Sequence, residues 1–139
     1  PESEGGTGQF VVNTVPFAIA RQIAAAAEDL PHGESEFELA GLTREPSERV
    51  GPPRVAESPI SFECETTQVV RTNPGEPGGG NIVMGRVVWV RARAGLVNER
   101  MHVDPADHDT IARMGGMGYC RTTDRFDLPV GRAALDAEL

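Results

Sequence analysis

The stretch from Ser58 to Arg93 constrains the fold most, because it contains two long apolar arms separated by a turn-rich segment. In the first arm, apolar residues alternate with polar ones: Ile60, Phe62 and Cys64 alternate with Ser61, Glu63 and Glu65. This period of two is typical of a strand with one buried face and one face in water. We therefore expect the polar residues of this arm to be solvated.

The second arm, residues 82–93, has apolar residues on both faces of the expected strand. Ile82, Met84, Val88 and Val90 fall on one face, and Val83, Val87 and Trp89 on the other. Such a strand is expected to be covered on both sides. The segment between the arms holds two prolines and four glycines, which favour a loop. The stretch therefore predicts an antiparallel hairpin at the centre of a mostly-β domain.

Composition limits the classes of function. The 139 residues, with 39% hydrophobic content, predict a single domain, residues 1–139, with its own core. A net charge of −8 argues against nucleic acid or an anionic membrane as the main partner. No apolar run approaches the ~18 residues of a membrane span. The two cysteines have no metal-ligand spacing, and we expect a cytoplasmic protein.

The segments before the hairpin predict short elements. We expect a strand over Phe10–Val15 and an amphipathic helix over Phe17–Leu30, capped by Thr14 or Asn13, with Pro16 near its first turn. A second, shorter helix is expected over Ser35–Ala40, with Gly41 at its C′ position. The proline-rich residues Thr43–Glu57 predict an extended surface connection.

After the hairpin, Asp104 and Pro105 predict the start of a helix that runs to Met114, where two glycines end it. The residues 121–130 that follow favour a short edge strand or an arm, and the C-terminal residues a frayed helix. His102 and His108 lie near Asp104 and Asp107 in the sequence, but carboxylates serving as helix caps explain this pattern better than a metal site does. Cys64 is expected to be a core residue.

The segment 113–119, Arg-Met-Gly-Gly-Met-Gly-Tyr, is the best candidate for a binding site. Adjacent glycines let the backbone approach a ligand, Arg113 offers a fixed positive charge, and Tyr119 offers a stacking surface. A structural interpretation is equally open from the pattern alone. In it, the glycines form a helix-ending turn, Tyr119 lies in the core, and Arg113 pairs with Asp109 one turn back.

Several motifs in a shared order resemble the flavin reductase-like, FMN-binding split-barrel family, which includes reductase components of two-component monooxygenases and flavoredoxin-like proteins. They are FVVN, EFELAGLT, PPRVAESPISFEC, GNIVMGRVV, VDPA and RMGGMGYCRTTDRFDLP, and together they extend from Gly8 to Pro129. The resemblance implies a Greek-key β-barrel with short flanking helices. It also implies a homodimer that binds FMN, uses NAD(P)H as hydride donor, and supplies reduced flavin to a partner monooxygenase. A non-enzymatic FMN-binding electron carrier is the alternative.

The resemblance assigns cofactor binding to Arg113, Gly115, Gly116 and Tyr119, and more weakly to Arg91 and Asn13. Two departures from the family pattern stand out. Arg86 and Arg91 take the places where relatives often carry a glutamate and a histidine. The first block of strands, about a third of the family pattern, is missing from the printed residues. We expect these residues to be part of a longer chain, because a barrel that lacks several strands would expose unpaired edges; a degenerate member that does not bind flavin is the alternative.

Overall fold

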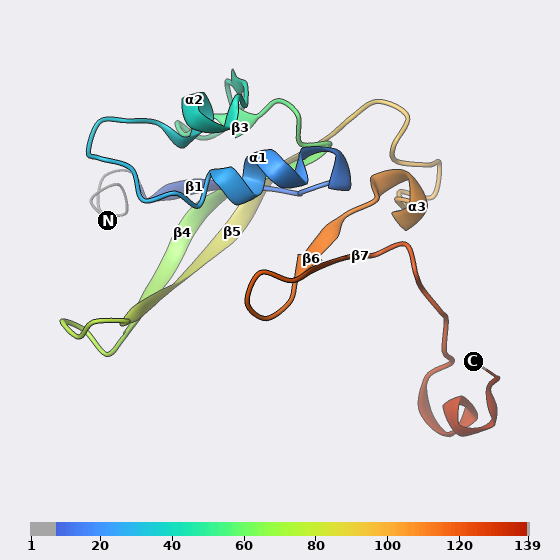
Figure 1. Ribbon diagram of the computed structural model, residues 1–139. Helices are drawn as coiled ribbons and strands as arrows, with labels where there is room; N and C mark the ends of the chain where they lie inside the picture. Colours follow the sequence, from blue (N-terminus) through green and yellow to red (C-terminus); the bar gives the residue numbers. More distant parts are fainter. Residues whose placement is uncertain (1–7, 139) are drawn as a thin grey trace.

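The computed structural model describes residues 8–138, which form a central antiparallel sheet with two small hairpins and short helices around it (Figure 1). In chain order the elements are β1 (Gln9–Asn13), the 3₁₀ helix η2 (Phe17–Ile19), α1 (Ala20–Ala25), α2 (Glu36–Ala40), β2 (Arg44–Glu45), β3 (Arg54–Val55), β4 (Ile60–Thr72), β5 (Gly80–Ala92), α3 (Pro105–His108), β6 (Ile111–Arg113), β7 (Tyr119–Arg121) and the 3₁₀ helix η3 (Gly131–Asp136). Strands therefore dominate, as the sequence predicts.

The central sheet has the strand order β1-β4-β5, and both neighbouring pairs are antiparallel. The β4–β5 hairpin is confirmed, with Ile60 opposite Ala92 at its base and Thr72 opposite Gly80 near its tip. Figure 1 shows its outer half extending away from the body of the molecule. The hairpin approaches Phe10 closely at Gly85, where a Cβ atom would lie 2.6 Å from the Phe10 ring. A side chain at this crossing would therefore force the Phe10 ring to move.

The expected wet face of β4 is buried at Ser61 and Glu63, so the prediction is wrong for these two residues, while Glu65 stays half exposed. Ser61 and Glu63 are each 1% exposed, because residues 44–57 fold over them. That segment is only in part the surface connection that its prolines predict: Pro46 and Pro53 are exposed, but the segment contains the paired strands β2 and β3, and Arg54 and Val55 are buried. The polar side chains of β4 are satisfied there, since Glu63 accepts hydrogen bonds from the backbone N–H groups of Glu48 and Arg49, at 2.8 and 2.6 Å.

The expectation for β5 is also wrong, because this strand is exposed on both faces. Ile82 is 55% exposed and Val90 52% exposed, and Val83, Val87 and Trp89 on the other face are exposed as well. Arg49 lies over Trp89, with its guanidinium 5.1 Å from the ring centroid. The buried apolar residues instead gather around the base of the hairpin: Ile19, Val50, Val55, Ile60, Cys64 and Leu96. Cys64 is thus the core residue that the sequence predicts.

The second helix has the expected bounds, whereas the first begins where expected but ends early. The side chain of Ser35 accepts a hydrogen bond from the Phe37 N–H, and Gly41 ends α2 in the left-handed conformation at φ 66°, as predicted. The first helix ends at Ala25 rather than Leu30, and no side chain caps it. Asn13 and Thr14, expected as caps, hydrogen-bond elsewhere.

The expected helix over Pro105–Met114 is wrong beyond its first turn. Asp104 caps it as predicted, accepting from the Ala106 N–H at 2.9 Å, but α3 ends at His108. Asp109 then adopts a left-handed φ of 45°, and the Ile111 N–H donates to the carbonyl of Val15 at 3.1 Å. A bond to a distant segment therefore replaces the next helical turn, and residues 111–113 form β6.

Candidate functional site

The RMGGMGY segment forms the tight connection of the β6–β7 hairpin rather than the end of a helix. Arg113 lies opposite Tyr119 and Ile111 opposite Arg121. The turn is closed by hydrogen bonds from the Met114 N–H to the Gly118 carbonyl, at 2.8 Å, and from the Gly118 N–H to the Gly115 carbonyl, at 3.1 Å. Gly116 has a φ of 59°, a conformation that a residue with a Cβ rarely adopts.

Arg113, Gly116 and Tyr119 contact one another across this turn. The guanidinium of Arg113 donates to the Tyr119 hydroxyl at 3.4 Å and to the Gly116 carbonyl at 3.2 Å. Its Cζ atom lies 5.6 Å from the centroid of the tyrosine ring. Tyr119 is 43% exposed, so the alternative that places it in the core is wrong. The sequence motif is therefore a local cluster with one aromatic face open to a ligand.

Asp109 pairs with Arg121 rather than with Arg113, so the proposed pairing one turn back is wrong. Arg121 donates from Nε to Oδ1 at 3.0 Å and from an Nη atom to Oδ2 at 2.5 Å. These hydrogen bonds raise the pKa of Arg121. The same guanidinium lies 4.2 Å from the ring centroid of Phe17, whose N–H donates to the carbonyl of Asp109 at 2.8 Å. Asp109 thus fixes both Arg121 and Phe17.

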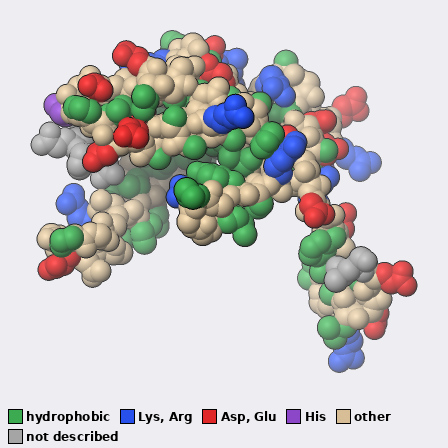
Figure 2. All heavy atoms as spheres, in the orientation of Figure 1, with side chains coloured by type: hydrophobic (Ala, Val, Ile, Leu, Met, Phe, Trp, Pro, Cys, Tyr) green, Lys and Arg blue, Asp and Glu red, His purple; other side chains and the backbone are tan. Residues whose placement is uncertain are grey.

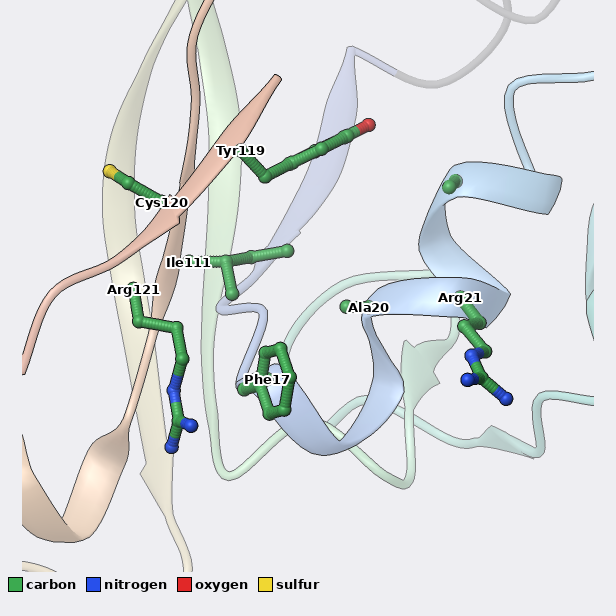
Figure 3. Close-up of a pocket in the computed structure, with 8 residues that line it drawn as sticks. Phe17, Ala20, Arg21, Ile111, Tyr119, Cys120 and Arg121 are labelled. Carbon is green, nitrogen blue, oxygen red and sulfur yellow. The ribbon is translucent and has the colours of Figure 1, made fainter. Parts of the chain in front are cut away.

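One face of the hairpin and the helix α1 enclose a slot of about 320 Å³. Its lining is apolar between two aromatic rings, and arginines lie at its margin: the lining residues are Phe17, Ala20, Arg21, Ala24, Ile111, Tyr119, Cys120 and Arg121. Figure 3 shows the Tyr119 ring reaching over the slot toward the helix, while the guanidinium groups of Arg21 and Arg121 extend on either side of Phe17. This volume is at the lower end of the range for ligand pockets, so the slot suits one ring system.

The other face of the hairpin borders a more polar depression of about 540 Å³, which His108, Thr110, Thr122 and Arg125 help to line. His108 hydrogen-bonds through Nε2 to the Thr14 hydroxyl, at 2.9 Å. Burial, and secondly the nearby charge of Arg93, lower the pKa of His108. The imidazole is therefore neutral at pH 7 and links α3 to the end of β1.

Asn13 and Arg91, the weaker predicted site residues, lie in a separate place. They occupy one row across the sheet, each directly opposite Ser61. The Oδ1 atom of Asn13 accepts from the Val55 N–H at 3.0 Å and from the Ser61 hydroxyl at 2.9 Å. Arg91 is exposed. Burial lowers the pKa of Arg54, and the positive charge of Arg91 lowers it further. Within residues 8–138, no hydrogen bond or ring contact joins Asn13 or Arg91 to the cluster around Tyr119.

The sequence interpretation did not identify Phe17, Arg21, Ile111 or Arg121 as site residues. Phe17 and Arg21 lie four residues apart, on the consecutive helices η2 and α1. Arg121 follows Tyr119 by two residues, which places these two on one strand face. These signals depend on knowing that residues 119–121 form a strand opposite 111–113. The sequence alone predicted a helix over residues 111–113, so it did not show that Tyr119 and Arg121 share a strand face beside Ile111.

Comparison with known proteins identifies the family of this chain. The sequence matches the flavin reductase like domain over residues 6–123. A Deinococcus radiodurans protein is 38% identical over 127 residues, which cover 89% of this chain and 54% of that protein. This chain belongs to the flavin reductase like domain family. The resemblance inferred from the motifs is confirmed.

Solved structures of flavin reductase like proteins place the fold. Component B of nitrilotriacetate monooxygenase from Bacillus cereus superposes with a TM-score of 0.80 at 30% identity, over 88% of this chain and 60% of that one. A protein with a split barrel domain from Shewanella frigidimarina superposes with a TM-score of 0.81 at 26% identity, over 94% of this chain and 64% of that one. The predicted split-barrel fold is confirmed. The chain spans between 54 and 61% of the length of the curated relatives it matches.

Proposed function

We propose that this protein, as a single flavin reductase like domain, is an NAD(P)H-dependent flavin reductase that binds FMN between α1 and the β6–β7 hairpin. In the reaction, NAD(P)H, FMN and a proton give NAD(P)⁺ and reduced FMN. One observation carries the proposal: a chain of this family has an aromatic slot with arginines at its margin (Figure 3). When bound, FMN supplies the two-electron chemistry, so no nucleophilic side chain is needed.

The residues of the hairpin turn fit a flavin. The exposed ring of Tyr119 offers a stacking surface, and the slot beside it is apolar. Arg113 has no carboxylate partner among residues 8–138, so its charge is available to an electron-rich ring edge or a phosphate. A Cβ atom at Gly115 would have no neighbour within 4 Å, so the backbone there is open to close approach. These residues would hold and orient the flavin, while Phe17 and Ile111 would shield one side of the slot from water.

Arg91 and Asn13 remain weaker candidates for flavin contact. Two hydrogen bonds already occupy the Oδ1 atom of Asn13, which leaves its side-chain N–H groups for a ligand. Arg91 is exposed, beside the like-charged Arg54, and an anionic group would offset that repulsion.

The partners that we propose are a second copy of the chain and an oxygenase that consumes reduced FMN. The exposed apolar faces of β5 support an interface, because monomers rarely leave a continuous apolar surface in water. Figure 2 shows hydrophobic side chains below the body of the molecule, beside the β4–β5 and β6–β7 hairpins. The relative from Bacillus cereus is a monooxygenase component, which favours an oxygenase partner. Sedimentation velocity tests the homodimer: a monomer at micromolar concentration would contradict it.

We also propose a cytoplasmic location, which the two unpaired thiols of Cys64 and Cys120 support. Among residues 8–138, none of the helices has the length and apolar character needed to cross a bilayer. Fractionation of cells that express the tagged protein tests this location.

The experiment that tests the proposed function combines flavin binding with NAD(P)H oxidation by the purified protein. We expect added FMN to lose fluorescence on binding, and NADH or NADPH to be oxidised only when flavin is present. Arg113→Gln should weaken FMN binding about tenfold, as expected for loss of a charged hydrogen bond, while Arg132→Gln in exposed η3 should not. Flavin binding without oxidation of either nucleotide would support the electron-carrier alternative instead. Absence of flavin binding would refute both.

A further inference from the structure

The slot concentrates positive charge in an acidic protein. The chain carries a net charge of −8, yet Arg21 and Arg121 line the slot and Arg113 stacks on Tyr119 at its edge. Among residues 8–138, the carboxylate that contacts this group is Asp109, which pairs with Arg121. The margin of the slot therefore keeps a net positive charge that its own residues do not neutralise.

The three arginines differ in how many of their donors are already used. Arg121 donates to both oxygens of Asp109, and Arg113 donates to Gly116 and Tyr119. Arg21 makes no hydrogen bond, ion pair or ring contact within residues 8–138. An incoming anion would have to compete with existing partners at Arg113 and Arg121, whereas the donors of Arg21 are open to it. Of the three arginines, Arg21 is thus the one whose hydrogen-bond donors are most available to an anion.

The position of Arg21 suits an anion attached to a ring. It belongs to α1, which together with Phe17 of the preceding η2 forms one wall of the slot. The neighbouring positions on that wall are Ala20 and Ala24, whose small side chains leave room for a planar group. Figure 3 shows the Arg21 guanidinium on the side of α1 away from Phe17, outside the ring-lined part of the slot. A ligand with its ring in the slot would bring a flexible, charged tail to this arginine.

We propose that Arg21 binds the phosphate of FMN and so makes the protein select phosphorylated flavin over riboflavin. The inference rests on the proposed function. In it, Arg113 contacts the flavin ring rather than the phosphate. A guanidinium presents parallel N–H donors that match phosphate oxygens, and hydrogen bonds between charged groups are the strong ones. Riboflavin has the same ring without the phosphate, so it gains nothing from Arg21.

Fluorescence titrations of FMN and of riboflavin with the purified full chain test this proposal. We expect the wild-type protein to bind FMN more tightly than riboflavin. Arg21→Gln should weaken FMN binding by about 10- to 100-fold, the range for loss of a charged hydrogen bond, and leave riboflavin binding unchanged. Arg21→Lys, which keeps the charge without the planar fork, should restore part of the preference. Arg132→Gln serves as the control for net charge.

The outcomes separate the two proposals. Equal weakening of both flavins by Arg21→Gln would mean that Arg21 supports the ring wall, and would overturn phosphate recognition. No change in either affinity would overturn it as well, while leaving the flavin reductase proposal intact. If the wild-type protein binds neither flavin, the proposed function itself fails. Circular dichroism of the variants checks that each is folded, which we expect because Arg21 is exposed.

Discussion

Glu63 holds the segment 47–51 on the central sheet. Replacing Glu63 should therefore destabilise the protein far more than replacing the neighbouring Glu65. The side chain is 1% exposed and accepts from the N–H groups of Glu48 and Arg49 at 2.8 and 2.6 Å. Hydrogen bonds to a charged group contribute about 1.5–3 kcal/mol each. Glu63→Gln keeps one acceptor but turns an amide donor toward the second N–H group. We expect a loss of about 2–4 kcal/mol in the free energy of unfolding.

Urea denaturation followed by tryptophan fluorescence measures this effect. Trp89 is the single tryptophan, and Arg49 stacks on it at 5.1 Å, so release of the segment should also change the emission of the native state. At a denaturant slope of about 2 kcal/mol per molar urea, the midpoint should fall by about 1–2 M.

The matched control is Glu65→Gln, two residues along the same strand. Glu65 is half exposed and pairs with Arg86 at 3.2 Å, so its loss should cost at most about 1 kcal/mol. If the two variants lose the same stability, and the native emission of Trp89 stays unchanged in Glu63→Gln, the argument that a buried carboxylate anchors this segment is refuted.

Three further predictions follow from contacts elsewhere in the chain. Gly85→Ala should lose about 1–3 kcal/mol of stability, since its Cβ would meet an aromatic ring at 2.6 Å, whereas Gly115→Ala, with no neighbour within 4 Å, should stay within about 0.5 kcal/mol in the same urea assay. The lowered pKa of His108 means that the unfolded chain binds its proton more readily; stability should fall as the pH drops below about 6.5, and His108→Gln should reduce that fall between pH 7.5 and 5.5. Maleimide should label exposed Cys120 quickly and Cys64 only in urea, because Cys64 is buried and burial raises its pKa; equal rates in the native protein would contradict this.

The sequence by itself determined the local features and the family. Ser35 and Gly41 bound α2, and Asp104 with Pro105 starts α3, because caps depend on residues within one turn. The two apolar arms and the glycine-rich segment between them determined the β4–β5 hairpin, because both strands and their loop lie in one continuous stretch of the chain. The ordered motifs identified the split-barrel relationship, which needs no knowledge of contacts.

Tertiary structure alone decided which faces are buried and which residues meet at the slot. Ser61 and Glu63 alternate as solvated residues would, yet other segments satisfy both: the Ser61 hydroxyl donates to Asn13, and Glu63 accepts from two backbone N–H groups. Ile111–Arg113 forms a strand because Ile111 bonds to Val15, nearly a hundred residues away in the chain. That choice of strand over helix places Tyr119 and Arg121 opposite Phe17. Local preference cannot encode such a contact, because its free energy exists only after the two segments have packed together.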